Sequence, residues 1–264
     1  MMRSLFAAIS GLRAHQLLLD VTANNIANVN TVGYKSERVS FKDALSQMQQ
    51  GAGAPVTGGL GGTNARQVGL GVQVGSIDNV MTSGAIQATG SPFDVAIQGK
   101  GWFQLSDVPT DTAGKFFTRS GNFAPDRDGR LVNPDGYYLL GAAGAITIDP
   151  TASSVSIAPN GQVIVDGAAV GTIQLAAFNN ESGLVRASGN RFQRSPNSDP
   201  GTITTGAPGS TGFGSLSAGT VEMSNVDLAQ EFTNMITAQR GFQANGRVIT
   251  ATDEVLQELV NLKR

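Results

Sequence analysis

The sequence predicts an α+β protein in which long N- and C-terminal helices pair as a coiled-coil-like core around an inserted, mainly-β middle domain. Apolar residues recur at alternating spacings of four and three near the N-terminus, and every seven residues near the C-terminus. All ten prolines lie between Pro55 and Pro208, and 30 of the 34 glycines lie between Gly51 and Gly219. Heptad spacing is typical of helices that pack along a narrow seam, whereas proline and glycine mark turns and loops.

The first helix is expected over residues 4–28, with Ser4 as its N-cap. At about 25 residues it would be roughly 37 Å long. Asparagine side chains compete for backbone hydrogen bonds, so the asparagines near its end predict termination in a defined turn. The predicted turn comprises Asn24, Asn25, Asn28, Gly33 and Tyr34. The apolar residues, called here the N-terminal stripe, are Leu5, Ile9, Leu12, Leu19, Ala23 and Ile26, with Gln16 at the remaining heptad place.

The last helix carries the matching C-terminal stripe. It consists of Leu228, Phe232, Met235, Phe242, Gly246, Ile249, Leu256 and Val260. Ser224 and Asn225 offer an N-cap, and Asp227 places a negative charge in the first turn, where the helix dipole favours it. These stripes indicate that the two ends were built to meet each other or to meet copies of themselves.

Two glycines interrupt the last helix, and each should cost roughly 1 kcal/mol relative to alanine. Gly241 and Gly246 could mark a kink. Alternatively, Gly246 lets a neighbouring helix approach closely, and we favour this second reading because the heptad continues undisturbed through Ile249 and Leu256.

The middle of the chain alternates short apolar runs with turn signals, which favours a small β-domain. A second short amphipathic piece is expected at 40–50 and an irregular loop at 51–62. Residues 94–98 and 101–105 flank Gly99-Lys100 as a hairpin-like or bulged connection. Further strands are expected near 72–77, 146–148, 155–157, 163–165 and 173–175, with a second loop at 196–214. Tight turns are predicted at Asp128-Gly129, Asp135-Gly136, Asn160-Gly161 and Asp166-Gly167.

These elements predict four segments. They are a core helix with its turn (1–35), a connecting region (36–75), a β-rich domain (76–220) and a C-terminal core helix (221–264). Large aromatic side chains should form the core of the β-rich domain, in preference to a ligand-stacking platform. They are Trp102, Phe103, Phe116, Phe117, Phe123, Tyr137 and Tyr138.

The composition argues against several classes of protein. Charged residues make up 14% of the chain and the net charge is −2, so neither nucleic acid nor an anionic membrane is suggested as a partner. No cysteine is present, which excludes thiol catalysis and disulfides. Neither a cleaved signal peptide nor a membrane-spanning run is visible.

No constellation of residues predicts catalysis, a cofactor or a metal site. His15 is the single histidine and has no partner for a dyad. Asp126-Arg-Asp-Gly resembles the start of a calcium loop but lacks the later ligands, so a β-turn is expected. Gly99-Lys-Gly101 and Gly69-Leu-Gly71 are incomplete as phosphate or dinucleotide motifs, and Ser120 lacks a general base. We expect no enzyme.

Three long segments, in the right order, resemble bacterial flagellar rod and hook proteins. Residues 20–35 (DVTANNIANVNTVGYK) resemble the family's N-terminal signature, and 223–245 (MSNVDLAQEFTNMITAQRGFQAN) its C-terminal partner. Residues 90–104 (GSPFDVAIQGKGWFQ) resemble the internal motif at the start of the middle domain. Within the family, residues 67–75 and the ending 253–264 lean towards the hook protein in its short form.

The resemblance implies a structural subunit that polymerises with copies of itself into the flexible hollow hook, which passes motor torque to the filament. It also implies passage through the type III flagellar export apparatus without a cleaved signal peptide, and contact with rod, hook-cap and hook–filament junction proteins. The localisation implied is the extracellular hook and basal body. We further hypothesise that both ends are disordered in the free monomer and fold on assembly, which amide exchange would test.

Two alternatives remain. The distal rod subunit has about this length and the same signatures, and residues 51–62 could correspond to a rod-specific insertion. An adhesin-like binding module could share the glycine-rich middle, but it would not require heptad helices at both ends.

Overall fold

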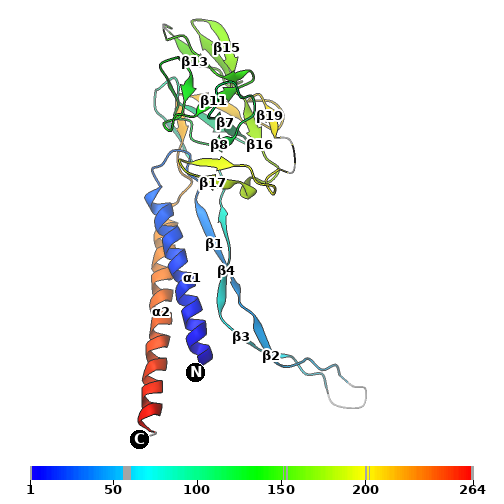
Figure 1. Ribbon diagram of the computed structural model, residues 1–264, viewed down its shortest axis with the longest axis vertical. Coiled ribbons are helices and arrows are strands. Elements are labelled where there is room, and N and C mark those ends of the chain that lie inside the picture. Colours follow the sequence, from blue (N-terminus) through cyan, green and yellow to red (C-terminus); the bar gives the residue numbers. More distant parts are fainter. Residues whose placement is uncertain are drawn as a thin grey trace. The chain divides into compact units, whose positions relative to one another are not determined.

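The protein has the α+β architecture expected from the sequence. The computed structural model describes residues 2–55, 61–150, 152, 154–199, 201 and 203–262 (Figure 1). The chain forms two compact units. The helical unit comprises Met1–Ala27, Glu37–Asp78 and Asp227–Arg264, and the β unit comprises Asn28–Ser36 and Asn79–Val226. The segment of the predicted turn after Ala27 thus belongs to the β unit, and most of the expected connecting region belongs to the helical unit.

Two long helices dominate the helical unit. Helix α1 spans Met2–Ala27 and helix α2 spans Leu228–Asn261. They lie side by side (Figure 1). Ser4 was expected to cap α1, but the helix already begins at Met2, so Ser4 lies within its first turn. The helix ends at Ala27, one residue before the expected end.

The cap of α2 also differs from the prediction. Asp227 is the N-cap, and its side chain accepts hydrogen bonds from the backbone N–H groups of Ala229 and Gln230. The predicted cap at Ser224 and Asn225 is wrong. The physical reason is that the carboxamide of Asn225 is fully used elsewhere, in contacts within the β unit described below.

The rest of the helical unit is an extended antiparallel ribbon. Strand β1 (Glu37–Asp43) pairs with β4 (Val72–Asn79), and β2 (Ser46–Gln50) pairs with β3 (Arg66–Gly69). The expected strand at 72–77 is confirmed as β4. The amphipathic piece expected at 40–50 is not one continuous element, because it is divided between the end of β1 and the whole of β2. Of the loop expected at 51–62, Gly53 pairs with Thr63 through two backbone hydrogen bonds of 2.9 and 3.0 Å, and residues 56–60 lie outside the described part.

The β unit is built on a ten-stranded sheet with β7 (Trp102–Ser106) at its centre. Strand β7 pairs with β8 (Phe116–Thr118), β11 (Tyr138–Gly141) and β16 (Leu175–Ala177), all antiparallel. The other strands of this sheet are β9 (Ala124–Pro125), β10 (Leu131–Val132), β12 (Gly144–Ala145), β17 (Val185–Ala187), β18 (Arg191–Gln193) and β19 (Thr204–Gly206).

Smaller sheets and one short helix complete the β unit. A three-stranded sheet contains β13 (Val155–Ile157), β14 (Gln162–Val165) and β15 (Ala168–Thr172). Strand β20 (Ser215–Ala218) pairs with β6 (Val95–Gln98), and β21 (Thr220–Glu222) pairs with β5 (Ile86–Ala88). A 3-10 helix, η1, spans Glu181–Gly183.

The hairpin expected between residues 94–98 and 101–105 does not form. Strand β6 pairs with β20, and β7 pairs in the large sheet. Between them, Gly99 and Gly101 have φ values of 115° and 130°, which glycine adopts readily and which redirect the chain from one sheet to the other. Every residue of β7 is buried, as a central strand requires.

The remaining local predictions are mostly met. Each predicted turn dipeptide contains a residue with positive φ, and Gly129 N–H donates to Asp126 O in the expected turn. Strands form at 155–157 and 163–165. However, residues 146–148 contribute only an isolated bridge through Thr147, and 173–175 enters a strand only at Leu175. The loop expected at 196–214 contains the short strand β19.

Aromatic and aliphatic side chains fill two apolar clusters of the β unit. Trp102, Phe103 and Phe117 are completely buried, and Phe123 is nearly so. Phe116, Tyr137 and Tyr138 are only half-buried. The rings of Phe116 and Tyr137 meet edge to face, with centroids 5.1 Å apart. The predicted aromatic set therefore forms the core and its margin.

Candidate functional site

The two long helices contact each other through small and polar residues. Asn25 Nδ2 donates to Glu231 Oε1 at 3.3 Å. Gly241 lies against the ring of His15, and Gly11 lies against the side chain of Asn245. From Asn25 to His15 the contact moves ten residues towards the start of α1. Over the same distance it moves from Glu231 to Gly241, ten residues towards the end of α2. The helices are therefore antiparallel in one constant register.

The buried face of each helix lies one residue before its predicted stripe. On α1 the buried or half-buried positions include Ala8, Gly11, His15, Leu18, Thr22 and Asn25. On α2 they include Glu231, Asn234, Ala238, Gly241, Asn245 and Thr252. Because one residue turns an α-helix by about 100°, both stripes are rotated away from the helix–helix contact.

The structure consequently leaves much of the predicted apolar surface uncovered. On α2, Leu228, Phe232, Phe242 and Val260 are 40%, 50%, 39% and 67% exposed. Met235, Gly246, Ile249 and Leu256 are half-buried. On α1, Ala23 is exposed, and the half-buried members are Leu5, Ile9, Leu12, Leu19 and Ile26. On each helix the stripe follows the buried face by one residue. Because the helices are antiparallel, this places both stripes on the same side of the helix pair, next to the contact.

The prediction of close approach at Gly246 is wrong within the subunit. A Cβ added at Gly246 would meet nothing within 4 Å. Close approach occurs instead at Gly241, where a Cβ would lie 2.5 Å from His15 Cε1, and at Gly11, where it would lie 2.7 Å from Asn245 Nδ2. The prediction fails because the residues that pack between the two helices lie one position before those of the predicted stripes. His15 acts as a packing residue, and its Nδ1 is buried without a hydrogen-bond partner among the described residues.

The predicted turn residues fall in both units. In the helical unit, Asn25 is 1% exposed; its Oδ1 accepts from Glu37 N–H and its Nδ2 donates to Glu37 O, which anchors β1 to the end of α1. Asn24, also in this unit, is exposed.

In the β unit, Asn28 Oδ1 accepts from Thr31 Oγ1. Gly33 has a φ of 68° and lies so close to the backbone of Ser120 that a side chain would clash. Tyr34 is buried beneath the guanidinium of Arg186.

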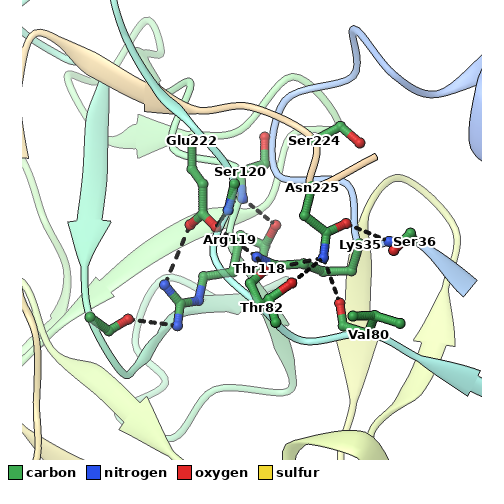
Figure 2. Close-up of polar contacts among 12 residues, drawn as sticks. Lys35, Ser36, Val80, Thr82, Thr118, Arg119, Ser120, Glu222, Ser224 and Asn225 are labelled. Carbon is green, nitrogen blue, oxygen red and sulfur yellow. Dashed lines mark hydrogen bonds and ion pairs between the residues drawn. The ribbon is translucent and has the colours of Figure 1, made fainter. Parts of the chain in front are cut away.

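A buried ionic cluster lies directly after this turn (Figure 2). Lys35 Nζ lies 2.6 Å from Glu222 Oε1, and Arg119 NH1 lies 3.4 Å from Glu222 Oε2. Lys35 also donates to Thr82 O, Gly84 N–H donates to Glu222, and Arg119 NH2 donates to Gly99 O. Burial lowers the pKa of Lys35 from its ordinary value, and the Glu222 carboxylate opposes that shift.

Asn225, which lies just before α2, hydrogen-bonds to backbone groups just before β1 and just after β4. Its Oδ1 accepts from Ser36 N–H, and its Nδ2 donates to Val80 O and Thr82 O (Figure 2). No pattern in the sequence predicts that Arg119, Glu222 and Asn225 lie together, although Lys35 and Asn225 fall inside the signature segments 20–35 and 223–245. The cluster holds the segments before β1 and before α2 together within the β unit.

No group of three His, Cys, Asp or Glu side chains in the described part could hold a metal ion. Asp126 accepts from the backbone N–H groups of Asp128 and Arg130, as a turn residue does. Ser120 donates to Asn122. Neither long helix of the described chain is apolar enough over its length to cross a membrane.

Comparison with known proteins agrees with these features. Three family models match, at residues 5–35 (flagella basal body rod protein), 96–165 (flagellar hook protein FlgE/F/G D1 domain) and 217–262 (flagellar basal body rod FlgEFG protein C-terminal). The chain is 47% identical over its whole length to the whole flagellar basal-body rod protein FlgG of Bacillus subtilis. It is 41% identical to FlgG of Caulobacter vibrioides, with 99% of this chain and 100% of that protein covered. The flagellar hook protein FlgE of Borreliella burgdorferi is 28% identical, with both chains covered completely.

A helix pair with an inserted β unit, matched by these models at both ends and in the middle and by FlgG of Bacillus subtilis over its whole length, defines a structural protein of the bacterial flagellum. The chain belongs to the family of flagellar basal-body rod and hook proteins. The resemblance noted in the sequence is confirmed at this level.

Proposed function

We propose that this protein is a subunit of the distal rod of the flagellar basal body, where copies of it polymerise into part of a rigid drive shaft. The hook subunit was the leading expectation from the sequence, and the rod its alternative. The findings favour the alternative.

The observation that carries the proposal is the full-length match to rod proteins. The alignment with the Bacillus subtilis rod protein runs over 270 positions, close to the 264 residues of this chain. The alignment with the hook protein of Borreliella burgdorferi needs 450 positions. A large part of that hook protein therefore has no counterpart here, and identity to it is lower.

Self-assembly is supported by the uncovered stripes. Exposed apolar side chains that gather on one side of a helix, as Leu228, Phe232 and Phe242 do on α2, are typical of interaction surfaces. The helix–helix contact within the subunit already uses the small and polar face, so the apolar row is free to meet other copies. Every copy of the chain carries the same exposed apolar residues, so each copy can offer this surface to another.

The partners and location follow from this proposal. The protein would contact itself, the adjacent axial proteins of the rod and hook, and the flagellar export apparatus that delivers it. It would lie outside the cytoplasm in the basal body, after delivery by that apparatus.

Electron microscopy of basal bodies from a strain lacking this gene tests the proposal. Rods that end before their distal part are expected, with restoration when the gene is supplied again. Complete rods with nothing beyond their outer end would instead assign the protein to the hook. Normal flagella would remove it from the axial structure altogether.

A further inference from the structure

Helix α2 extends beyond the start of α1. The constant antiparallel register places Gly11 opposite Asn245, so Met2 falls opposite Glu254. The residues after Glu254, up to the end of the helix at Asn261, have no counterpart among the described residues of α1, which begin at Met2. Seven such residues make an overhang about 10 Å long. The red end of α2 extends past the blue start of α1 in Figure 1.

One face of this overhang is apolar and exposed. Val255 and Leu259 of the overhang, and Leu262 at its C-cap, are 43%, 46% and 82% exposed, and they lie at the spacing of one helical face. Glu258 lies among them on the same face. From Ala251 to Leu262 the charged residues are Asp253, Glu254 and Glu258, and Lys263 and Arg264 follow them in the sequence. The charge on the apolar face itself is the carboxylate of Glu258.

A groove of complementary character lies elsewhere on the helical unit. It runs between α1 and β4, has a volume of about 520 Å³ and is open to solvent. Its lining includes Phe6, Ile9, Arg13, Leu17, Val72 and Val74. Phe6 is 61% exposed, and Arg13 is exposed as well. The groove is therefore apolar with one cation.

We propose that the overhang of one subunit docks in the α1–β4 groove of a second copy. Val255, Leu259 and Leu262 would fill the apolar groove, and Glu258 would meet Arg13. The end of a continuous helix cannot fold back into its own groove. Two different surfaces thus join head to tail, a heterologous contact that continues from copy to copy and builds an open filament.

This inference rests on the proposed self-assembly but is separate from the stripes. Val260 of the C-terminal stripe lies on a different side of α2 from the Val255 face. The docking adds a specific longitudinal contact between copies.

Disulfide cross-linking tests the contact directly, because the chain has no cysteine of its own. Gln73, an exposed residue of β4 that lines the groove, is changed to cysteine together with Leu259→Cys. After oxidation of assembled rods, a ladder of covalent oligomers is expected on a non-reducing gel. The matched pair Gln73→Cys and Val260→Cys should give monomer only, since Val260 faces away.

A charge exchange gives an independent readout. Arg13→Glu and Glu258→Arg should each reduce assembly at least about tenfold, and the double variant should recover most of it. Rods that form but give no ladder with Leu259→Cys, or a double variant no better than either single one, would overturn the docking while leaving self-assembly intact. Absence of assembly by the unmodified chain would count against the proposed function itself.

Discussion

The Nζ atom of Lys35 and the Oε1 atom of Glu222 lie 2.6 Å apart, although the residues are separated by 187 positions in the sequence. Both side chains are 1% exposed. Lys35 lies just before β1 and Glu222 ends β21, so the pair joins the chain segments that follow the first helix and precede the last. Arg119 makes the cluster a triad with one carboxylate and two cations.

Glu222→Gln is expected to destabilise the β unit by about 3–5 kcal/mol, because it leaves two buried cations without a counter-charge. Trp102 is the single tryptophan and is completely buried in this unit, so its fluorescence during urea unfolding reports on the β unit alone.

The Lys115–Asp107 pair is the matched control for that variant. Its Nζ–Oδ1 distance is also 2.6 Å, but its side chains are 49% and 55% exposed. Asp107→Asn should leave the urea midpoint nearly unchanged, because solvent screens exposed pairs. Equal effects of Asp107→Asn and Glu222→Gln would refute the argument from burial.

Glu231 makes the helix contact sensitive to pH. Burial raises its pKa above the ordinary value of 4.5, while hydrogen bonds from Asn25 and Asn234 oppose the shift. The folded state then binds the proton more tightly than the unfolded state. The contribution of Glu231 to stability is therefore fully present below pH 4.5 and is lost as pH rises through the raised pKa. In assembled protein, where the terminal helices are expected to be folded, circular dichroism at 222 nm should show the helices melting earlier at pH 7 than at pH 4.5, and Glu231→Gln should flatten this difference.

The two glycines of α2 should respond oppositely to alanine. Gly246→Ala places its methyl group in open space and should strengthen the helix by up to about 1 kcal/mol. Gly241→Ala would push against the His15 ring and should lower the helical melting temperature. A similar gain in both variants would mean that Gly241 does not hold the helices together.

Patterns within short segments of the sequence predicted much of the fold. Heptad spacing located both helices, turn dipeptides such as Asp166-Gly167 located the turns, and the aromatic residues located the core of the β unit. These features depend on residues close together in the chain. The heptad frame was harder to place, because the contact between helices uses Gly11 and Gly241 rather than the larger apolar residues one position later.

Features set by distant partners were not predictable. Nothing near Glu222 indicates that Lys35 and Arg119 will surround it, and the capping role assigned to Asn225 failed because its carboxamide reaches Ser36 and Val80. Likewise, β6 and β7 look like a hairpin locally, but β20 is the partner that β6 finds.

The central claim is that the uncovered apolar stripe joins copies of this chain. Phe242→Ser, introduced into a strain lacking the gene, tests it most directly, with Gln243→Ser at the adjacent exposed position as the control. Electron microscopy should show truncated rods for Phe242→Ser and normal rods for Gln243→Ser, while purified Phe242→Ser keeps the Trp102 fluorescence of the folded β unit and the helical circular dichroism of the unmodified chain. Rods of full length with Phe242→Ser would contradict the account.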